Sequence, residues 1–338
     1  MSDLQIGLIS LGVILILVLV CFNWWQDRRV RQRMQEHFPE ADEDPLMGGL
    51  PVAAGRREPG IGPTAGADPA VDEVTEADPV CEAVIDVVFS HPVSGAELQQ
   101  AVRAIQKAGE KPVRVLVEHE GGHTLRLREG NAYLSVQLAV LLANRSGALT
   151  DIEWSHLWTI AQDLAERFEG SVEGPEQPQV LQRAQALDEL CASLDAQVGL
   201  ALRLGGTRAL GEVLQAVKDA GFVSYGSQLA WMSEAGVPRF ILLFDGEPAA
   251  DFQSEGVDRL DLLLDVPRSQ PDEQAFSRMA SVGRDLAARL GGTLVDDQAQ
   301  PVLENADHAI DEKLHELYKN LEKAGFPAAE GRTARLFS

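Results

Sequence analysis

The segment QDLAERFEG at residues 162–170 recurs as RDLAARLGG at residues 284–292. Upstream of it, AIQKAG at residues 104–109 recurs as AVKDAG at residues 216–221. In each copy of the upstream segment a Lys is followed by a Gly, which is typical of the C-terminal end of a helix. Matching segments that keep one order, at separations of 112 to 122 residues, predict that one unit is present twice.

Each copy shows the same series of elements. A strand, at 82–89 in the first copy and 197–204 in the second, leads into a helix, several strands and two further helices. In the first copy the Gly121-Gly122 pair predicts a hairpin. This series is that of a split βαβ unit with added hairpins, so it predicts an α+β fold in which an antiparallel sheet carries helices on one face. The other face of each sheet is then open to solvent or to a partner.

The rest of the chain divides by composition. Residues 4–25 carry no formal charge, and a helix of that length spans about 33 Å, enough for a transmembrane helix. Arginines follow at once, which favours a retained anchor with its N-terminus outside over a cleaved signal peptide or a buried helix. Residues 26–78 are predicted to be a basic stop and a disordered acidic, Pro- and Gly-rich linker. We then place a first, degenerate domain at 79–195, a second at 196–326 and a disordered tail at 327–338.

Charge and cysteine content limit the possible partners. The 338 residues contain 52 acids and 29 bases, a formal net charge of −23. Such a chain repels phosphate backbones, so we expect no nucleic-acid partner. The three cysteines, Cys21, Cys81 and Cys191, have neither metal-ligand nor disulfide spacing. We therefore expect no metal and no cofactor.

The chain also lacks a recognisable catalytic constellation. Three pairs of residues could suggest a site. His119 and His123 are separated by a glycine turn, and His308 and His315 on a helix have no third metal ligand. Asp296 and Asp297 are adjacent acids, which fit a turn better than paired carboxylate catalysis. The sequence therefore predicts a protein that is not an enzyme.

Several segments of the second copy match a known family. They are Ala220-Gly221-Phe222 after the first helix, Val266-Pro267 at a strand end, and LGGTLVDDQ at residues 290–298. Together with the apolar N-terminal segment, they resemble the ZipA family of bacterial cell-division proteins. The resemblance covers the anchor and about residues 196–326. The first copy is similar only in outline, because its counterpart of the last segment lacks the double Gly and the Asp-Asp-Gln.

The resemblance implies a non-enzymatic adaptor. Proteins of this family hold the tubulin-like FtsZ at the inner membrane by binding its C-terminal tail in a shallow apolar groove on the open face of the sheet. A single-pass inner-membrane protein is thus implied, with a periplasmic N-terminus and with cytoplasmic domains at the midcell division site. The competing hypothesis is a membrane-anchored scaffold or regulatory domain that dimerises or binds another division protein.

Alternation along the strands of the second copy selects the residues of the open face. Small outward residues on its first strand would form a depression, and outward apolar residues on two later strands would supply a floor. Aspartates beside them predict an acidic rim suited to a basic peptide. The predicted peptide-binding residues are Gly199, Ala201, Ile241, Leu243, Leu263 and Asp245, with Asp261 and Asp265 on either side of Leu263. The alternative is that Ile241 and Leu243 are covered by the protein itself, for example by the first copy's sheet. The first copy presents Ser135 and Gln137 outward, so its open face is predicted to be largely polar.

Overall fold

The computed structural model describes residues 76–119, 122–124, 127–303 and 306–338, which all fall within one compact unit, residues 63–338. The predicted transmembrane helix (4–25) and most of the predicted linker (26–78) lie outside these residues. Among the helices of the described part, none combines the length and apolar character needed to cross a membrane. The folded part begins earlier than residue 79, because Asp78 is buried and its backbone N–H donates to the carboxylate of Glu82.

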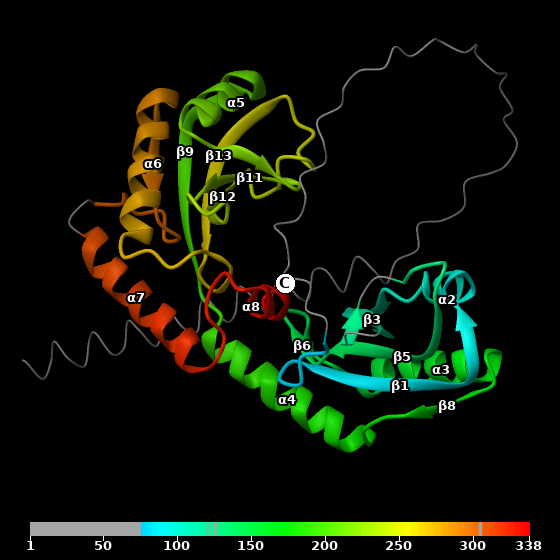
Figure 1. Cartoon of the computed structure of the whole chain (residues 1–338). Coiled ribbons are helices and arrows are strands. Elements are labelled where there is room, and N and C mark those ends of the chain that lie inside the picture. Colours follow the sequence, from blue (N-terminus) through cyan, green and yellow to red (C-terminus); the bar gives the residue numbers. More distant parts are fainter. Residues whose placement is uncertain (1–75, 120–121, 125–126, 304–305) are drawn as a thin grey trace, which may run out of the picture. The chain divides into compact units, whose positions relative to one another are not determined.

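The first half of the described chain forms an antiparallel sheet with the strand order β2-β3-β5-β1-β8, and β4 pairs with β3 (Figure 1). The strands and helices of this half are β1 (Glu82–Ser94), α2 (Gly95–Val102), β2 (Lys107–Ala108), β3 (Lys111–His119), β4 (Gly122–Thr124), β5 (Ala132–Leu141), β6 (Ala143–Asn144), β7 (Gly147–Ala148), α3 (Asp151–Arg167), β8 (Gly170–Glu173) and α4 (Gln177–Leu194). Strands β6 and β7 form a separate small hairpin. Helix α3 packs against β1 and β8.

The second half forms an antiparallel sheet with the order β10-β11-β12-β13-β9-β14. Its elements are β9 (Gln197–Ala209), α5 (Leu210–Asp219), β10 (Val223–Tyr225), β11 (Gln228–Met232), β12 (Pro238–Phe244), β13 (Gly256–Asp265), η1 (Val266–Arg268), α6 (Ala275–Leu290), β14 (Gly292–Val295), α7 (Asp307–Lys323) and α8 (Gly331–Leu336). Helix α6 packs against β9, β13 and β14. The predicted α+β class with antiparallel sheets and packed helices is therefore confirmed.

The two sheets share one strand order over their centres. In the first half the order is β3-β5-β1-β8, and in the second it is β12-β13-β9-β14, with all neighbours antiparallel. Each sheet places its own first strand between a long antiparallel partner and the short strand that follows a long helix. The sheets fall on either side of the predicted boundary between residues 195 and 196. That the chain carries one domain twice stays a prediction.

Strand register explains which face of the second sheet lies under helices. Leu242 on β12 is paired with Leu262 on β13, which is paired with Leu200 on β9, and all three are buried. Side chains of paired residues share a face, so these leucines form one row beneath α6. Gly283 on α6 lets the helix approach this row closely, because a Cβ there would lie 2.9 Å from a methyl carbon of Leu262. Helix α5 contacts α6 as well as β9 and β13, so these two helices lie together.

Two local predictions in the first half have different outcomes. The Gly121-Gly122 hairpin is confirmed by the pairing of Val117 with Thr124 across β3 and β4. The prediction that the first helix extends to Gly109 is wrong, because α2 ends at Val102 and Lys107–Ala108 forms a strand. The Lys-Ala-Gly signal marks a tight turn here, where Gly109 has a φ of 60° and reverses the chain into β3.

The prediction of a disordered tail at 327–338 is wrong. Residues Gly331–Leu336 form helix α8, and Leu336 and Phe337 are buried. The sequence gives little sign of this helix, because residues 329–335 are mostly polar and only two large apolar residues, Leu336 and Phe337, come after them. Burial of these two side chains against the rest of the folded chain stabilises this short helix, which would be marginal on its own.

Candidate peptide-binding face

The open face of the second sheet carries a row of apolar and small residues. Ile241 on β12 is paired with Leu263 on β13, and Leu263 is paired with Gly199 on β9. The neighbouring row joins Leu243, Asp261 and Ala201 in the same way. Since paired residues share a face, the structure brings five of the six predicted residues together on one surface. We call the surface formed by Gly199, Ala201, Ile241, Leu243 and Leu263 the apolar floor.

The apolar floor is accessible. Ile241, Leu243 and Leu263 are half-buried, whereas their sequence neighbours Phe240 and Leu242 are buried against the helices. A Cβ added to Gly199 would lie 3.9 Å from the carbonyl oxygen of Leu262, which is ordinary van der Waals contact. Space is therefore open above Gly199 at the β9 side of the floor, and the predicted depression there stays a prediction.

Sequence reasoning missed one member of this surface. Ala230 on β11 is paired with Ile241 and extends its row by one strand. The alternation was available, because Leu229 is buried on the helix side and Ala230 must then point to the opposite face. Ala230 is 0% exposed, so this face is covered at β11 and the accessible floor ends at β12.

Contact with the first half occurs at one end of this face. Arg145, in the β6–β7 hairpin, donates from Nη1 to Asp265 at 2.6 Å and from Nη2 to Asp195 at 2.7 Å. Asp265 is two residues beyond Leu263 on the same side of β13. The first half thus occupies the strand end near Asp265, and the half-buried floor residues lie further along the strands.

Two aspartates of the predicted acidic rim, Asp265 and Asp245, already form hydrogen bonds within the protein. Asp265 is bound by Arg145, as described above. Asp245 lies in the turn after β12 with a φ of 50°, and its carboxylate accepts from the backbone N–H groups of Arg259 at 2.8 Å and Asp258 at 3.4 Å. These bonds give Asp245 a structural part in the turn, where an Asp tolerates the left-handed conformation.

Asp261 is the acid placed within the floor. It is half-buried between Leu243 and Ala201, and its Oδ2 accepts from Nε of Arg259 at 3.0 Å. Burial raises the pKa of Asp261 above its ordinary value, although the guanidinium of Arg259 opposes this shift. A carboxylate in a desolvated apolar surface attracts a cation more strongly than one in water.

The open face of the first sheet differs in chemistry. Asp86 on β1 is paired with Gln137 on β5, and the amide of Gln137 donates to the Asp86 carboxylate at 2.7 Å. Further along the same face Glu82 is bound by Arg114. Val88 is the large apolar residue exposed on this part of β1, at 42%. This face therefore mixes polar pairs with the apolar residues Val84, Leu116 and Val88, so its predicted polar character is seen only in part.

The candidate metal and catalytic pairs remain apart from this surface. In the described ranges no group of three or more His, Cys, Asp or Glu side chains is placed to hold a metal ion. The Asp296 carboxylate accepts from the backbone N–H groups of Gln298 and Gln300, so the predicted turn is confirmed. His308 and His315 are exposed on α7.

An antiparallel sheet with helices packed on one face and apolar residues on the other defines an α+β domain. Residues 229–313 match the family model of the ZipA C-terminal FtsZ-binding domain. The match runs from β11 into α7, so it confirms the resemblance to ZipA within the second sheet. It indicates FtsZ binding in cell division and a non-catalytic domain. A search of curated proteins finds no match to the chain.

The matched residues include part of the apolar floor. Ile241, Leu243 and Leu263 lie within the match, whereas Gly199 and Ala201 on β9 precede it. The first sheet lies wholly outside it. Which of the floor residues bind a peptide stays a prediction.

Proposed function

We propose that the protein is a membrane tether of the division ring, which binds the C-terminal tail of FtsZ on the apolar floor of the second sheet. The uncovered row of Ile241, Leu263 and Gly199 carries this proposal, because it lies partly in the stretch that matches an FtsZ-binding domain. The N-terminal residues 4–25 would anchor the chain in the inner membrane as a single span, with the N-terminus periplasmic and both sheets cytoplasmic at midcell.

A titration of the full chain in detergent with a labelled FtsZ tail peptide tests this function. We expect saturable binding, measured by fluorescence anisotropy, and loss of binding when the apolar residues of the peptide are replaced by Ser. No binding by the folded chain would contradict the proposal. The alternative, a membrane-anchored scaffold that dimerises or binds another division protein, would then remain. A measurement of the oligomeric state of the chain would show whether it dimerises.

Asp261 is expected to select peptides that carry a basic residue beside their apolar anchors. The substitution Asp261→Asn should weaken binding of the FtsZ tail about tenfold at low salt and reduce the salt dependence of the affinity. Because the pKa of Asp261 is raised, its contribution should fade on acidification at a pH above the usual aspartate range. The measurement is an anisotropy titration at several salt concentrations and pH values.

The matched control for this effect is Asp251→Asn, at an exposed position in the loop between β12 and β13. It removes the same charge from the same half of the chain and should leave affinity nearly unchanged. A second control is a peptide with its basic residues replaced by Gln, which should bind wild type and Asp261→Asn equally. An equal loss with both peptides would show that Asp261 shapes the floor and does not select charge.

A further inference from the structure

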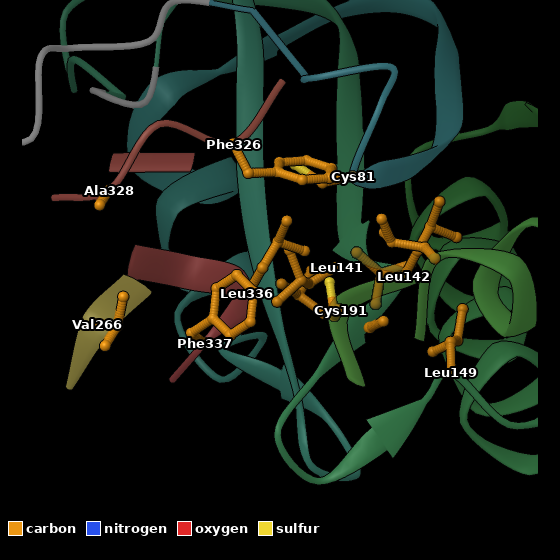
Figure 2. Packing of buried hydrophobic residues seen from close by; sticks show 14 of the residues in the cluster. Cys81, Leu141, Leu142, Leu149, Cys191, Val266, Phe326, Ala328, Leu336 and Phe337 are labelled. Atoms are coloured by element: carbon orange, nitrogen blue, oxygen red, sulfur yellow. The ribbon is translucent and has the colours of Figure 1, made fainter. Parts of the chain in front are cut away.

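The C-terminal residues 326–338, here called the C-terminal segment, are packed among residues of both halves. Phe326, Leu336 and Phe337 are each at most 2% exposed. Figure 2 shows the ring of Phe326 over Cys81, and Leu336 and Phe337 beside Leu141 and Cys191. These partners come from the first half, so apolar residues that follow the second sheet in sequence complete the core of the first.

Three ion pairs connect the C-terminal segment to the start of the first half, and the longest of them joins Arg335 to Asp78 at 3.8 Å. Arg335 donates from Nη1 to Oε1 of Glu82 at 2.7 Å, and Arg332 donates from Nε to Oδ2 of Asp78. The two carboxylates are nearly buried, with side-chain exposures of 2% and 8%. Release of the segment would leave the carboxylate of Asp78 without either arginine, whereas Glu82 would keep its pair with Arg114, so the constraint rests mainly on Asp78.

The same segment is joined to the second half. The backbone N–H of Ala329 donates to the carbonyl oxygen of Pro267 in η1 at 3.0 Å. The ring of Phe337 lies 5.9 Å from the guanidinium carbon of Arg145, which itself binds Asp265 at the end of β13. One short segment therefore contacts both sheets at once.

We propose that the C-terminal segment is a clasp that fixes the two sheets relative to each other. Further connections between the halves are the chain between α4 and β9, the packing of α4 on α7, and the Arg145 bridge. The clasp adds three ion pairs to two nearly buried carboxylates, together with three buried apolar side chains. Release of the clasp leaves the central strands of each sheet paired as before, because none of them takes a strand partner from residues 326–338.

Two native cysteines report on the clasp. Cys81 is 0% exposed and Cys191 is 6% exposed, and both lie in the apolar cluster that receives the C-terminal segment. Burial raises the pKa of each thiol to about 12. Since the thiolate is the reactive species, both cysteines are slow to react with a maleimide at pH 8 while the clasp is closed.

The test is the double variant Arg332→Glu with Arg335→Glu in the full chain in detergent. We expect maleimide labelling of Cys81 and Cys191, quantified by peptide mass spectrometry, to accelerate more than about 100-fold. Amide hydrogen exchange in β5 and β13 should stay as slow as in wild type. The matched control is Lys319→Glu with Lys323→Glu, which makes the same charge change at two exposed positions on α7.

Either of two results would overturn the clasp. Labelling rates equal to those of the control would show that the arginines do not hold the segment closed. Fast labelling together with fast exchange in both β5 and β13 would show that the segment belongs to one cooperative core, so that its release unfolds the whole unit. A chain that ends at residue 325 supplies a second variant, for which the same two readouts decide in the same way.

Discussion

Replacement of Ile241 or Leu243 by Glu is expected to weaken binding of the FtsZ tail peptide more than about 100-fold. Both side chains are half-buried on the apolar floor, where a carboxylate would stay solvated in the free protein and would be desolvated by the bound peptide. The melting temperature should fall by only a few degrees, because the buried neighbours Phe240, Leu242 and Phe244 are untouched. Anisotropy titration and thermal unfolding followed by circular dichroism measure the two effects.

The control for these variants is Leu303→Glu, the same kind of change at a residue that is 64% exposed outside the floor. It should alter neither affinity nor melting temperature. A large fall in melting temperature for Ile241→Glu would mean that this residue is core, as the alternative interpretation of the sequence held. Unchanged affinity with unchanged stability would instead place the peptide on another surface.

Arg145→Ala is expected to lower the free energy of unfolding of the unit of residues 63–338 by about 3 kcal/mol. Arg145 forms hydrogen bonds with both Asp195 and Asp265, and all three side chains are at most 20% exposed. Its removal leaves two carboxylates close together without their shared cation. Urea unfolding of the isolated unit, monitored by circular dichroism, gives the change.

An exposed Arg–Asp pair supplies the comparison. Arg289 donates to Asp285 at 2.7 Å on α6, and both side chains are more than 40% exposed. Arg289→Ala should therefore cost less than about 0.5 kcal/mol. Adding Asp265→Asn to Arg145→Ala should restore part of the lost stability, because one unpaired charge disappears. If Arg145→Ala cost no more than Arg289→Ala, the bridge between the halves would not contribute to stability.

Local signals predicted the architecture of the second sheet because its residues obey local rules. Alternating burial along β12 follows from the alternation of apolar residues on the helix side, and Gly291 ends α6 with a φ of 68°. The first half departs from the rule at the equivalent point: Glu169 takes a φ of 50° after α3, where Gly is favoured. The repeat was predicted despite this difference because the matching segments keep one order along the chain.

Which aspartates and glutamates are already paired within the protein could not be predicted from the sequence, since their partners lie far away in the chain. Asp265 lies 120 positions from Arg145, and Arg335 lies 253 positions from Glu82. No periodicity or spacing encodes such pairs. The order in the C-terminal segment was missed for the same reason: the buried surroundings of Leu336 and Phe337 include residues far away in the sequence.

The attachment point of the proposed tether has a mechanical consequence. Residues before Glu76 connect to the folded unit beside Asp78, and the first long element that follows is β1, which lies between β5 and β8. A pull from the membrane would thus act along a strand held by a ladder on both sides, so that many hydrogen bonds would share the load. Arg332 and Arg335 form ion pairs with Asp78 and Glu82 where the folded unit begins. If the proposed tether and the proposed FtsZ site are both in use, tension between them would cross from the first sheet to the second, and the C-terminal segment would carry part of it beside the chain between α4 and β9 and the Arg145 bridge.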